Sequence, residues 1–278
     1  MNGFAAELLS AYSTGEMLVA PPSLRDPGFD LATAYVVEAQ LTRLRRESGR
    51  TTVGRKVGYA SKALWRKLKL ETLVWARMYD DTVKYAENGS AVLSLAGMCS
   101  PRVEPEIVFK LKQPIRSPSA SDALEAVEWF ALGFEIVDCV FPDWKFQPAD
   151  FVASYGLHAA LIVGEPVHVE PEMIAALAEQ LPTFKVRLLR DGQLIEEGSG
   201  KNSLGSPALS LGELAAAIGR QPGAEPLAAG ELISSGSLTA SHPVADGQRW
   251  TFEVDALSCC TTENRAAAIT VTFAHRWA

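Results

Sequence analysis

The chain has 278 residues, 47% of them hydrophobic, and a formal net charge of −7. This length allows one large domain, or one domain with a smaller appendage, around a substantial buried core. The negative charge and the lack of a dense lysine and arginine block argue against a nucleic-acid surface, where phosphate neutralisation supplies most of the affinity. Small molecules are therefore the expected partners.

The beginning of the chain is unlike a secretory signal, because the stretch from Met1 to Tyr12 lacks a basic region and carries Glu7 among apolar residues. No apolar run approaches the length that spans a bilayer, so we expect a cytoplasmic protein. The cysteines have no CxxC spacing, and we predict reduced thiols in buried or half-buried positions. They are Cys99, Cys139, Cys259 and Cys260.

More helix than strand is predicted in the first third of the chain. Asp30 stands as an N-cap before an apolar stripe at helical spacing, and Gly49 follows the arginine-rich end of this helix. Glycines and two valines favour a strand over about 52–59, and a second helix is expected over about 62–70. A soft boundary near residues 70–80 then separates two parts, a mostly helical region (1–75) and a β-rich domain (76–278).

Two carboxylates stand two residues apart in a stretch that reads as an extended strand. In a strand, Glu104 and Glu106 point to one face, whereas Val103 and Ile107 point to the other. The two like charges repel unless a divalent cation, a nearby lysine or arginine, or solvent neutralises them, and Mg²⁺ and Mn²⁺ prefer oxygen ligands. For such a pair alone, a solvated strand face is the commoner explanation.

The later two thirds are predicted as short strands and turns with few helices. One helix is expected from Asp122, as its cap, to Leu132, and another is expected to start at Ser210. Asp191 and Gly192 between two apolar runs are a strong hairpin signal. Further strands are expected over 134–140, 249–254 and 268–274.

Two charged residues interrupt apolar strands. An ionised carboxylate at Glu135 must be paired, coordinated or protonated, so this residue is either a metal ligand or the partner of a cation such as Lys145. Lys56 lies among glycines and small apolar residues, where a solvated head on a snorkelling stem is the commoner fate of a lysine. The alternative places Lys56 beside an acid-bound metal, where it holds a substrate carboxylate or moves a proton.

Several short segments follow one another in a specific order. They are Lys56–Gly58 with Ser61–Ala63, Asp80–Asp81, Pro101–Ile107, Glu135–Asp138, Gly198 and Gly200 before Leu204–Pro207, and Ser235–Ala240. Together they resemble the fumarylacetoacetate hydrolase superfamily, and within it the branch of 2-oxopent-4-enoate hydratases and 4-oxalocrotonate decarboxylases. The resemblance covers roughly residues 30–275.

The resemblance implies a mixed α/β fold of the α+β kind, in which a β-rich roll like that of fumarylacetoacetate hydrolase carries a smaller, mostly helical N-terminal region. It also implies one Mg²⁺ or Mn²⁺ ion, whose ligands would be Glu104, Glu106 and Glu135. Lys56 matches the family's active-site lysine. Ser237 and Thr239 lie in a turn similar to a family loop that lines the pocket and receives oxyanions.

The expected activity is that of a metal-dependent hydratase of small 2-oxo or 2-hydroxydienoic acids, such as 2-hydroxypenta-2,4-dienoate, in the degradation of aromatic compounds. A 4-oxalocrotonate-type decarboxylase and an acylpyruvate-type C–C hydrolase are the enzymatic alternatives. A different class of function is a catalytically weakened keto-acid-binding protein, or a structural subunit of a hydratase–decarboxylase complex. The family suggests a homo-oligomer.

Two departures from the family's pattern affect the chemistry. Leu73 and Val74 stand where hydratases typically carry Pro-Asp, so an expected acid is missing. The family's Asp-Asn-Ala-Ser run corresponds to Ser154–Leu157, and His158 follows it. We predict His158 as a catalytic proton donor, with Tyr155 as another candidate, although a structural role is commoner for a lone histidine among apolar residues.

Two other motifs do not carry a function. Gly198 and Gly200 follow a hairpin rather than the first strand of a βαβ unit, so they do not indicate dinucleotide binding. The histidines show no metal-binding spacing, which argues against a zinc enzyme. They are His158, His168, His242 and His275.

Overall fold

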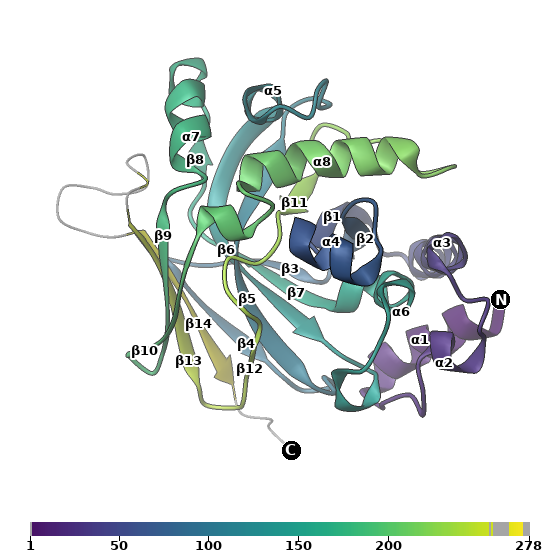
Figure 1. The fold of residues 1–278 in the computed structure, drawn as a ribbon. Helices are drawn as coiled ribbons and strands as arrows, with labels where there is room; N and C mark the ends of the chain where they lie inside the picture. Colours follow the sequence, from purple (N-terminus) through teal and green to yellow (C-terminus); the bar gives the residue numbers. More distant parts are fainter. Residues whose placement is uncertain (1, 256, 258–266, 275–278) are drawn as a thin grey trace.

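Two β-sheets form the frame of the computed structural model, which describes residues 2–255, 257 and 267–274 (Figure 1). The larger sheet has nine strands in the order β2-β1-β11-β5-β6-β7-β3, with β12 added on β5 and β8 on β6. Its strands are β1 Thr52–Gly58, β2 Val74–Tyr79, β3 Val83–Tyr85, β5 Pro101–Leu111, β6 Val127–Asp138, β7 His158–Val163, β8 Val167–His168, β11 Leu232–Ser234 and β12 His242–Pro243. The second sheet has the order β10-β9-β13-β14-β4. Its strands are β4 Ser90–Ser94, β9 Lys185–Arg190, β10 Gln193–Ser199, β13 Arg249–Asp255 and β14 Ala267–Ala274.

In the part of the chain that the structure describes, helices lie along one side and at one end of these sheets (Figure 1). They are α1 Asn2–Thr14, α2 Pro22–Arg25, α3 Leu31–Glu47, α4 Lys62–Leu68, α5 Ala120–Glu125, α6 Pro148–Ala153, α7 Ile174–Gln180 and α8 Pro207–Arg220. Figure 1 shows α1, α2 and α3 grouped at one end of the molecule, whereas α8 runs across another side. This arrangement confirms the predicted mixed α/β class with a mostly helical N-terminal part.

The sequence predicts the first elements correctly. Asp30 caps α3, because its carboxylate accepts a hydrogen bond from the backbone N–H of Thr33 at 2.8 Å. The predicted strand over 52–59 and helix over 62–70 are β1 and α4. The division into residues 1–75 and 76–278 stays a prediction. Residues from both sides of it share the larger sheet, because β1 pairs with β11 as well as with β2.

The predicted helix over 122–132 is wrong for most of its length. Helix α5 is capped by Ser119 and ends at Glu125, and residues from Val127 onward belong to β6. The apolar side chains of this segment are buried on both faces of a sheet, so their spacing does not distinguish a strand from a buried helix. Pairing with β5 over its full length decides in favour of the strand.

The predicted start of a helix at Ser210 is also wrong. Helix α8 begins three residues earlier, at Pro207, and the hydroxyl of Ser206 caps it by accepting from the N–H of Ala208. A serine followed by proline at the first helical position is the usual signal for such a start. Ser210 lies inside the helix and donates to the carbonyl of Ser235 at 2.7 Å.

The predicted hairpin and the predicted terminal strands are confirmed. Asp191 and Gly192 join β9 to β10 with positive φ angles of 51° and 80°, which a tight two-residue hairpin turn requires.

Cys139 is buried and Cys99 half-buried, and both are free thiols as predicted. Cys259, Cys260 and His275 lie outside the described residues.

Alternation along β5 and β6 gives the larger sheet two different faces. One face packs against the second sheet, where the rings of Phe134 and Phe252 lie 6.0 Å apart between centroids. The opposite face carries Glu104 and Glu106 on β5, and Val108 continues this face into a separate apolar cluster. The acidic pair therefore lies on the face turned away from the second sheet.

Partly buried polar contacts tie the N-terminal helices to α6 and to this sheet. The carboxylate of Asp150, in α6, accepts hydrogen bonds from both the N–H and the hydroxyl of Ser23. The hydroxyl of Tyr12 donates to the carbonyl of Asp138 at 3.0 Å. Among the described helices, none has the length and apolar character needed to cross a membrane.

Candidate metal centre and its cavity

Antiparallel pairing of β5 with β6 brings three carboxylates together. Glu104 lies directly opposite Glu135, and Glu106 lies opposite Gly133, so all three side chains share one face. One oxygen of each carboxylate lies within 4.8 Å of the others. We call Glu104, Glu106 and Glu135 the carboxylate cluster.

Burial makes this cluster electrostatically expensive. Burial, together with the charges of its two neighbours, raises the pKa of Glu106 well above its usual range. Burial also raises the pKa of Glu104, to about 7, although Lys56 opposes this shift. For Glu135, the charge of Lys56 and a hydrogen bond from His158 outweigh burial and hold the pKa of the carboxyl below its usual value.

One oxygen of the cluster is ready to accept a ligand. Glu106 is fully buried, and its Oε2 accepts hydrogen bonds from Ser234 and from the N–H of Gly236. Its Oε1 has no hydrogen-bond partner within the described part of the chain. Buried carboxylate oxygens without donors are the atoms that hard divalent cations prefer. The donor set therefore fits Mg²⁺ or Mn²⁺.

Lys56 lies beside the cluster rather than in solvent. The residue is 2% exposed, and its Nζ lies 3.0 Å from Glu135 Oε2 and 3.0 Å from the carbonyl oxygen of Gly156. Burial lowers the pKa of Lys56, but the three carboxylates outweigh burial and raise it. The snorkelling interpretation of Lys56 is therefore wrong.

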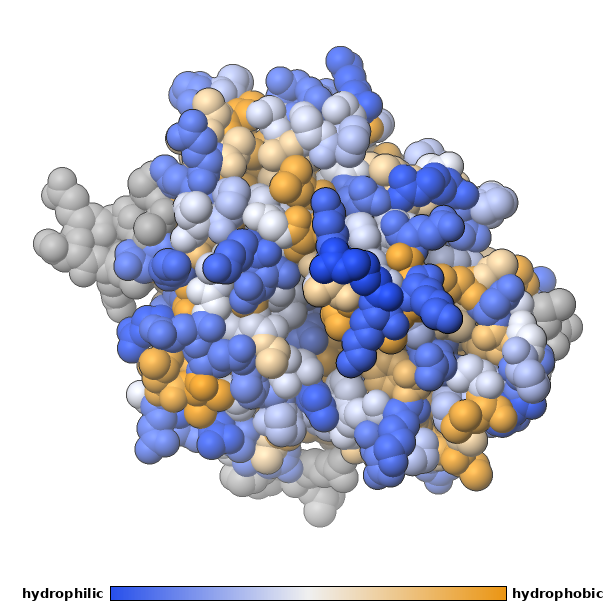
Figure 2. Space-filling model, viewed as in Figure 1, coloured by the Kyte–Doolittle hydropathy of each residue, from blue (hydrophilic) through white to orange (hydrophobic). Residues whose placement is uncertain are grey.

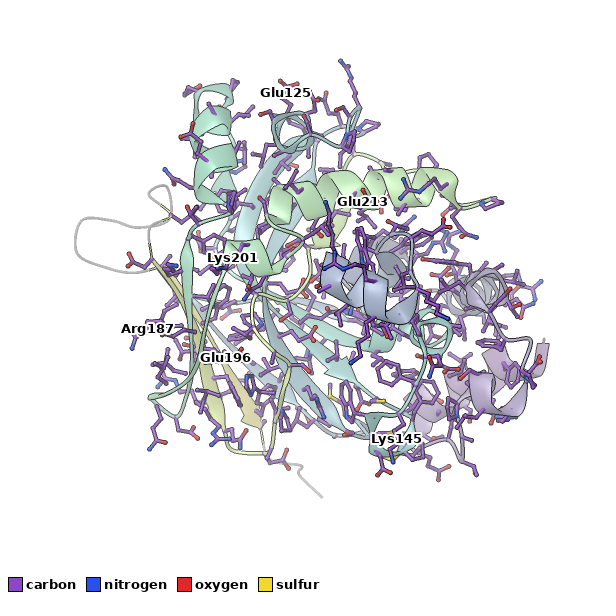
Figure 3. The ribbon with its side chains drawn as sticks, in the orientation of Figure 1. Glu125, Lys145, Arg187, Glu196, Lys201 and Glu213 are labelled. Carbon is purple, nitrogen blue, oxygen red and sulfur yellow. The ribbon has the colours of Figure 1, made fainter. Side chains whose placement is uncertain are left out.

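The alternative partner proposed for Glu135 is also wrong. Lys145 lies at the edge of the molecule in Figure 3 and pairs with Asp143 at 3.2 Å. Its side chain is 79% exposed, whereas Glu135 is fully buried. The groups that face Glu135 are instead Lys56 of β1 and His158 of β7.

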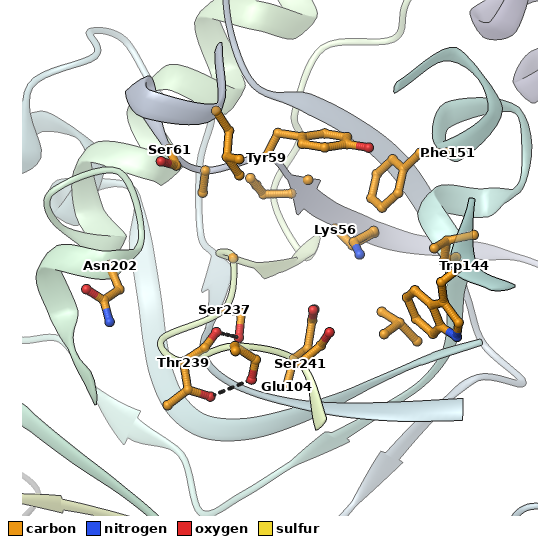
Figure 4. Close-up of a pocket in the computed structure, with 18 of the residues that line it drawn as sticks. Lys56, Tyr59, Ser61, Glu104, Trp144, Phe151, Asn202, Ser237, Thr239 and Ser241 are labelled. Carbon is orange, nitrogen blue, oxygen red and sulfur yellow. Dashed lines mark hydrogen bonds between the residues drawn. The ribbon is translucent and has the colours of Figure 1, made fainter. Parts of the chain in front are cut away.

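Lys56 and Glu104 open onto a cavity of about 600 Å³. Figure 4 shows both side chains facing the same space, with Trp144 and Phe151 on one side of it. The other side carries small polar side chains. Those labelled there are Asn202, Ser237, Thr239 and Ser241.

In the view of Figure 2, polar and charged residues cover much of the surface, and apolar residues form separate patches between them.

Ser237 and Thr239 line this cavity as expected from the family loop. Their hydroxyl protons are directed inside the turn, because Ser237 donates to the carbonyl of Thr239 and Thr239 donates to that of Ala240. Each hydroxyl oxygen therefore offers lone pairs to the cavity as an acceptor. The backbone N–H of Gly236 is already bonded to Glu106.

His158 lies behind the cluster rather than in this cavity. Its Nδ1 is 2.9 Å from Glu135 Oε1, its Nε2 is 2.9 Å from Thr82 Oγ1, and it lines a second cavity of about 320 Å³. The predicted catalytic role of His158 stays a prediction. The contacts of Thr82 were not predicted, and no motif marks this residue.

The missing acid leaves an apolar position. Val74, where the hydratase pattern has aspartate, is 3% exposed in β2. Phe151, whose ring lies 4.9 Å from Lys56 Nζ, was not predicted either. A side chain on Gly58 would collide with this ring, which explains the glycine in the Lys56–Gly58 segment.

Comparisons with known proteins agree with this architecture. The family model for the C-terminal domain of fumarylacetoacetate (FAA) hydrolase matches residues 57–265. The chain is 30% identical over 247 residues to 2-hydroxyhexa-2,4-dienoate hydratase of Comamonas testosteroni, which covers 88% of this chain and 90% of the relative. It is 32% identical over 251 residues to 4-oxalocrotonate decarboxylase of a Pseudomonas species, covering 88% and 93%.

A solved structure has the same fold. The 4-oxalocrotonate decarboxylase from Pseudomonas putida G7, complexed with magnesium and adipate, superposes with a TM-score of 0.84 at 24% identity. The match covers 98% of this chain and 96% of that chain. The resemblance predicted from the ordered segments is confirmed.

Proposed function

The chain belongs to the fumarylacetoacetate hydrolase family, and on that premise we propose that it is a divalent-metal-dependent lyase of small 2-oxo and 2-hydroxydienoic acids, such as 2-hydroxypenta-2,4-dienoate. Relatives named as hydratases and decarboxylases support this enzyme class. The observation that carries the proposal is the carboxylate cluster itself, with a free buried oxygen on Glu106 and a buried lysine beside it at the edge of a cavity.

The carboxylate cluster would hold Mg²⁺ or Mn²⁺. A bound divalent ion supplies a Lewis acid that polarises the 2-oxo group of the substrate. The three carboxylates would balance the charge of the ion, which relieves the repulsion among them. Two of the three residues are fully buried, so the protein would hold them in place before the ion arrives.

Lys56 is suited to binding a substrate carboxylate. An ammonium group has three N–H donors, and Glu135 and the carbonyl of Gly156 face two of them. The remaining donor is available to the cavity that Lys56 lines. In the metal-free protein the carboxylates raise the pKa of Lys56, so the ammonium is protonated at neutral pH and can donate a hydrogen bond to a substrate carboxylate.

The two walls of the cavity suit the two ends of a dienoic acid. Aromatic side chains such as Trp144 and Phe151 pack against a planar apolar chain and exclude water from it. The opposite wall carries the hydroxyl oxygens of Ser237 and Thr239, which can accept hydrogen bonds from a substrate hydroxyl or an attacking water.

Hydration is the leading reaction, and decarboxylation is the second candidate. The valine at position 74 favours the second, because the acid expected of hydratases is absent. The 32% identity to a 4-oxalocrotonate decarboxylase also supports decarboxylation. Decarboxylation needs the polarised 2-oxo group but no added water.

Turnover tests the proposal directly. Purified protein with Mg²⁺ or Mn²⁺ should remove the ultraviolet absorbance of 2-hydroxypenta-2,4-dienoate, and chelation of the metal should stop this loss. Parallel assays with 4-oxalocrotonate separate decarboxylation from hydration. A lack of turnover of these two acids and of acylpyruvates with either metal would favour a keto-acid-binding protein.

The metal site has its own test. Replacement Glu106→Gln should weaken Mn²⁺ binding, measured by calorimetry, by more than about 100-fold, since loss of an outer-shell partner alone costs about 10- to 100-fold. Glu125→Gln is the matched control, because Glu125 is an exposed glutamate on α5 (Figure 3). Equal Mn²⁺ affinity in the Glu106 variant and the wild type would refute the metal site.

The proposal also covers the cellular location and the oligomeric state of the enzyme. We expect a cytoplasmic protein that forms a homo-oligomer, as the family resemblance implies, with one metal site in each subunit. A hydratase–decarboxylase complex remains part of the same expectation. Light scattering coupled to size-exclusion chromatography, with and without an added decarboxylase relative, measures both.

A further inference from the structure

A strained turn stands directly behind the carboxylate cluster. Tyr155, Gly156 and Leu157 have consecutive φ angles of 56°, 60° and 59°. The left-handed region is unfavourable for a residue other than glycine, because its Cβ crowds the backbone. Such strain persists only where the surroundings impose it, and it concentrates at functional sites. Tyr155 and Leu157 are 7% and 2% exposed, so burial of their side chains holds the turn.

The turn contacts both members of the buried ion pair. The carbonyl oxygen of Gly156 accepts a hydrogen bond from Lys56 Nζ at 3.0 Å. The next side chain beyond the turn, His158, places Nδ1 at 2.9 Å from Glu135 Oε1. Lys56 itself lies 3.0 Å from the other oxygen of that carboxylate, Oε2. One short segment thus fixes the lysine and the glutamate from behind.

His158 is itself held in place. Its Nε2 lies 2.9 Å from the hydroxyl of Thr82, and the residue is 4% exposed. Nδ1–H donates to the carboxylate of Glu135, while Nε2 and the carbonyl of Tyr79 both lie 2.9 Å from the hydroxyl of Thr82. These contacts fix the plane of the ring and aim Nδ1 at the carboxylate.

Lys56 explains the glycine at the centre of the turn. A Cβ on Gly156 would lie 2.6 Å from Lys56 Cδ and 3.1 Å from the Cβ of Ala76. Any side chain at this position would push the lysine out of its place. The backbone comes this close because its carbonyl must reach the ammonium group.

We propose that the segment Tyr155–His158 is a positioning device for the site, in which Gly156 fixes Lys56 and His158 fixes the carboxylate of Glu135. This inference rests on the proposed function. His158 is absent from the residues that line the larger cavity, so it acts through Glu135 rather than on the substrate. Outer-shell partners of this kind orient metal ligands, and their loss costs about 10- to 100-fold in metal affinity.

The first test removes the imidazole. His158→Ala should bind Mn²⁺ about 10- to 100-fold more weakly than the wild type in calorimetry of the metal-free protein. Added imidazole should restore part of the affinity, because the second cavity reaches the vacated position. His168→Ala is the matched control, since His168 is exposed on β8 and should leave the affinity unchanged.

The second test moves the lysine. Gly156→Ala should lower turnover at least about tenfold and change Mn²⁺ affinity less, because the added methyl collides with Lys56 and not with a carboxylate. Gly49→Ala is the matched control: Gly49 also has a positive φ, of 85°, but nothing lies within 4 Å of its Cβ position. The control should keep full turnover.

The outcomes distinguish the two proposals. If the wild type binds Mn²⁺ and His158→Ala binds it equally well, the positioning role is overturned and the metal site stands. If the wild type binds no Mn²⁺, the proposed function fails and this inference fails with it. Thermal melting checks that each variant is folded. If His158→Ala does not fold, Thr82→Val replaces it, with an expected loss of a few-fold and the same criterion for rejection.

Discussion

Two neighbouring residues of β1, Arg55 and Lys56, are buried, point to opposite faces of the larger sheet and enter two different charged clusters. Lys56 enters the carboxylate cluster. On the other face lies an arginine cluster, in which arginines and glutamates alternate. Its members are Arg46, Arg55, Arg77, Glu38, Glu225 and Glu231.

The two clusters differ in their balance of charge. In the arginine cluster each cation has a carboxylate partner, as in the pairs Arg77–Glu38 and Arg55–Glu231, the latter at 2.8 Å. In the carboxylate cluster, Lys56 contacts Glu135 at 3.0 Å and its charge acts on all three carboxylates, while the charge of Arg102 also acts on Glu104. Balanced buried charges hold elements together, whereas an excess of one sign predicts a ligand of the other sign. The comparison therefore separates structure from function within one sheet.

The largest effect is expected from unbalancing the arginine cluster. Arg77→Met leaves the buried carboxylate of Glu38 without its closest cation. Removing one partner of a buried pair costs about 3–5 kcal/mol. Urea unfolding of the metal-free variant should show this loss, while its Mn²⁺ affinity stays at the wild-type value. A loss below about 1 kcal/mol would mean that this cluster is not structural.

The matched change in the carboxylate cluster should affect chemistry instead. Lys56→Met removes the ammonium that faces the cavity, and we expect turnover to fall about 100-fold, a loss of about 2.7 kcal/mol in transition-state stabilisation. Mn²⁺ affinity should remain or increase, because the lysine no longer competes for Glu135. Steady-state kinetics and calorimetry measure the two effects. Equal losses in both would contradict the role of Lys56.

The parts of the site that lie on one strand could be predicted from the sequence. Glu104 and Glu106 share a face because strand periodicity requires it, and the structure agrees. Glu135 needed the family resemblance, since its apolar strand allowed a salt bridge as well as a metal. The pairing of β5 with β6, which places Glu135 opposite Glu104, does not follow from periodicity alone.

The contacts of His158 could not be predicted, for a reason that lies in the sheet. Ile136 pairs with Ala160, but a bulge then pairs Val137 with His158 and skips Ala159. Such a bulge changes the direction of a side chain without any clear signature in the sequence. The predicted helix over 122–132 failed for a related reason, because a segment buried on both sides hides the strand period.

The carboxylate cluster should also make the stability of the folded protein depend on pH. Burial raises the pKa of Glu104 from 4.5 to about 7 and that of Glu106 well above its usual range. An acid whose pKa is higher in the folded state than in the unfolded state binds its proton more tightly when folded, so stability falls as pH rises through this window. Glu135, whose pKa is lowered in the folded state, has the opposite effect on stability. Its contribution is lost only as the pH falls below the pKa that it has in the unfolded state.

Metal binding should therefore stabilise the protein more at high pH than at low pH, which is the smallest effect predicted. At pH 8 Glu104 is largely ionised and repels its neighbours until Mn²⁺ binds, whereas at pH 5.5, below its pKa of about 7, Glu104 carries a proton that Mn²⁺ must displace. We expect the Mn²⁺-induced rise in melting temperature to be a few degrees larger at pH 8, or about 1 kcal/mol for a chain of this size. Scanning calorimetry with and without Mn²⁺ at both pH values measures the difference. Arg77→Met should show the same difference between the two pH values, because Arg77 lies on the other face of the sheet. A Mn²⁺-induced rise in melting temperature that does not depend on pH would mean that the carboxylate cluster is not the site of binding.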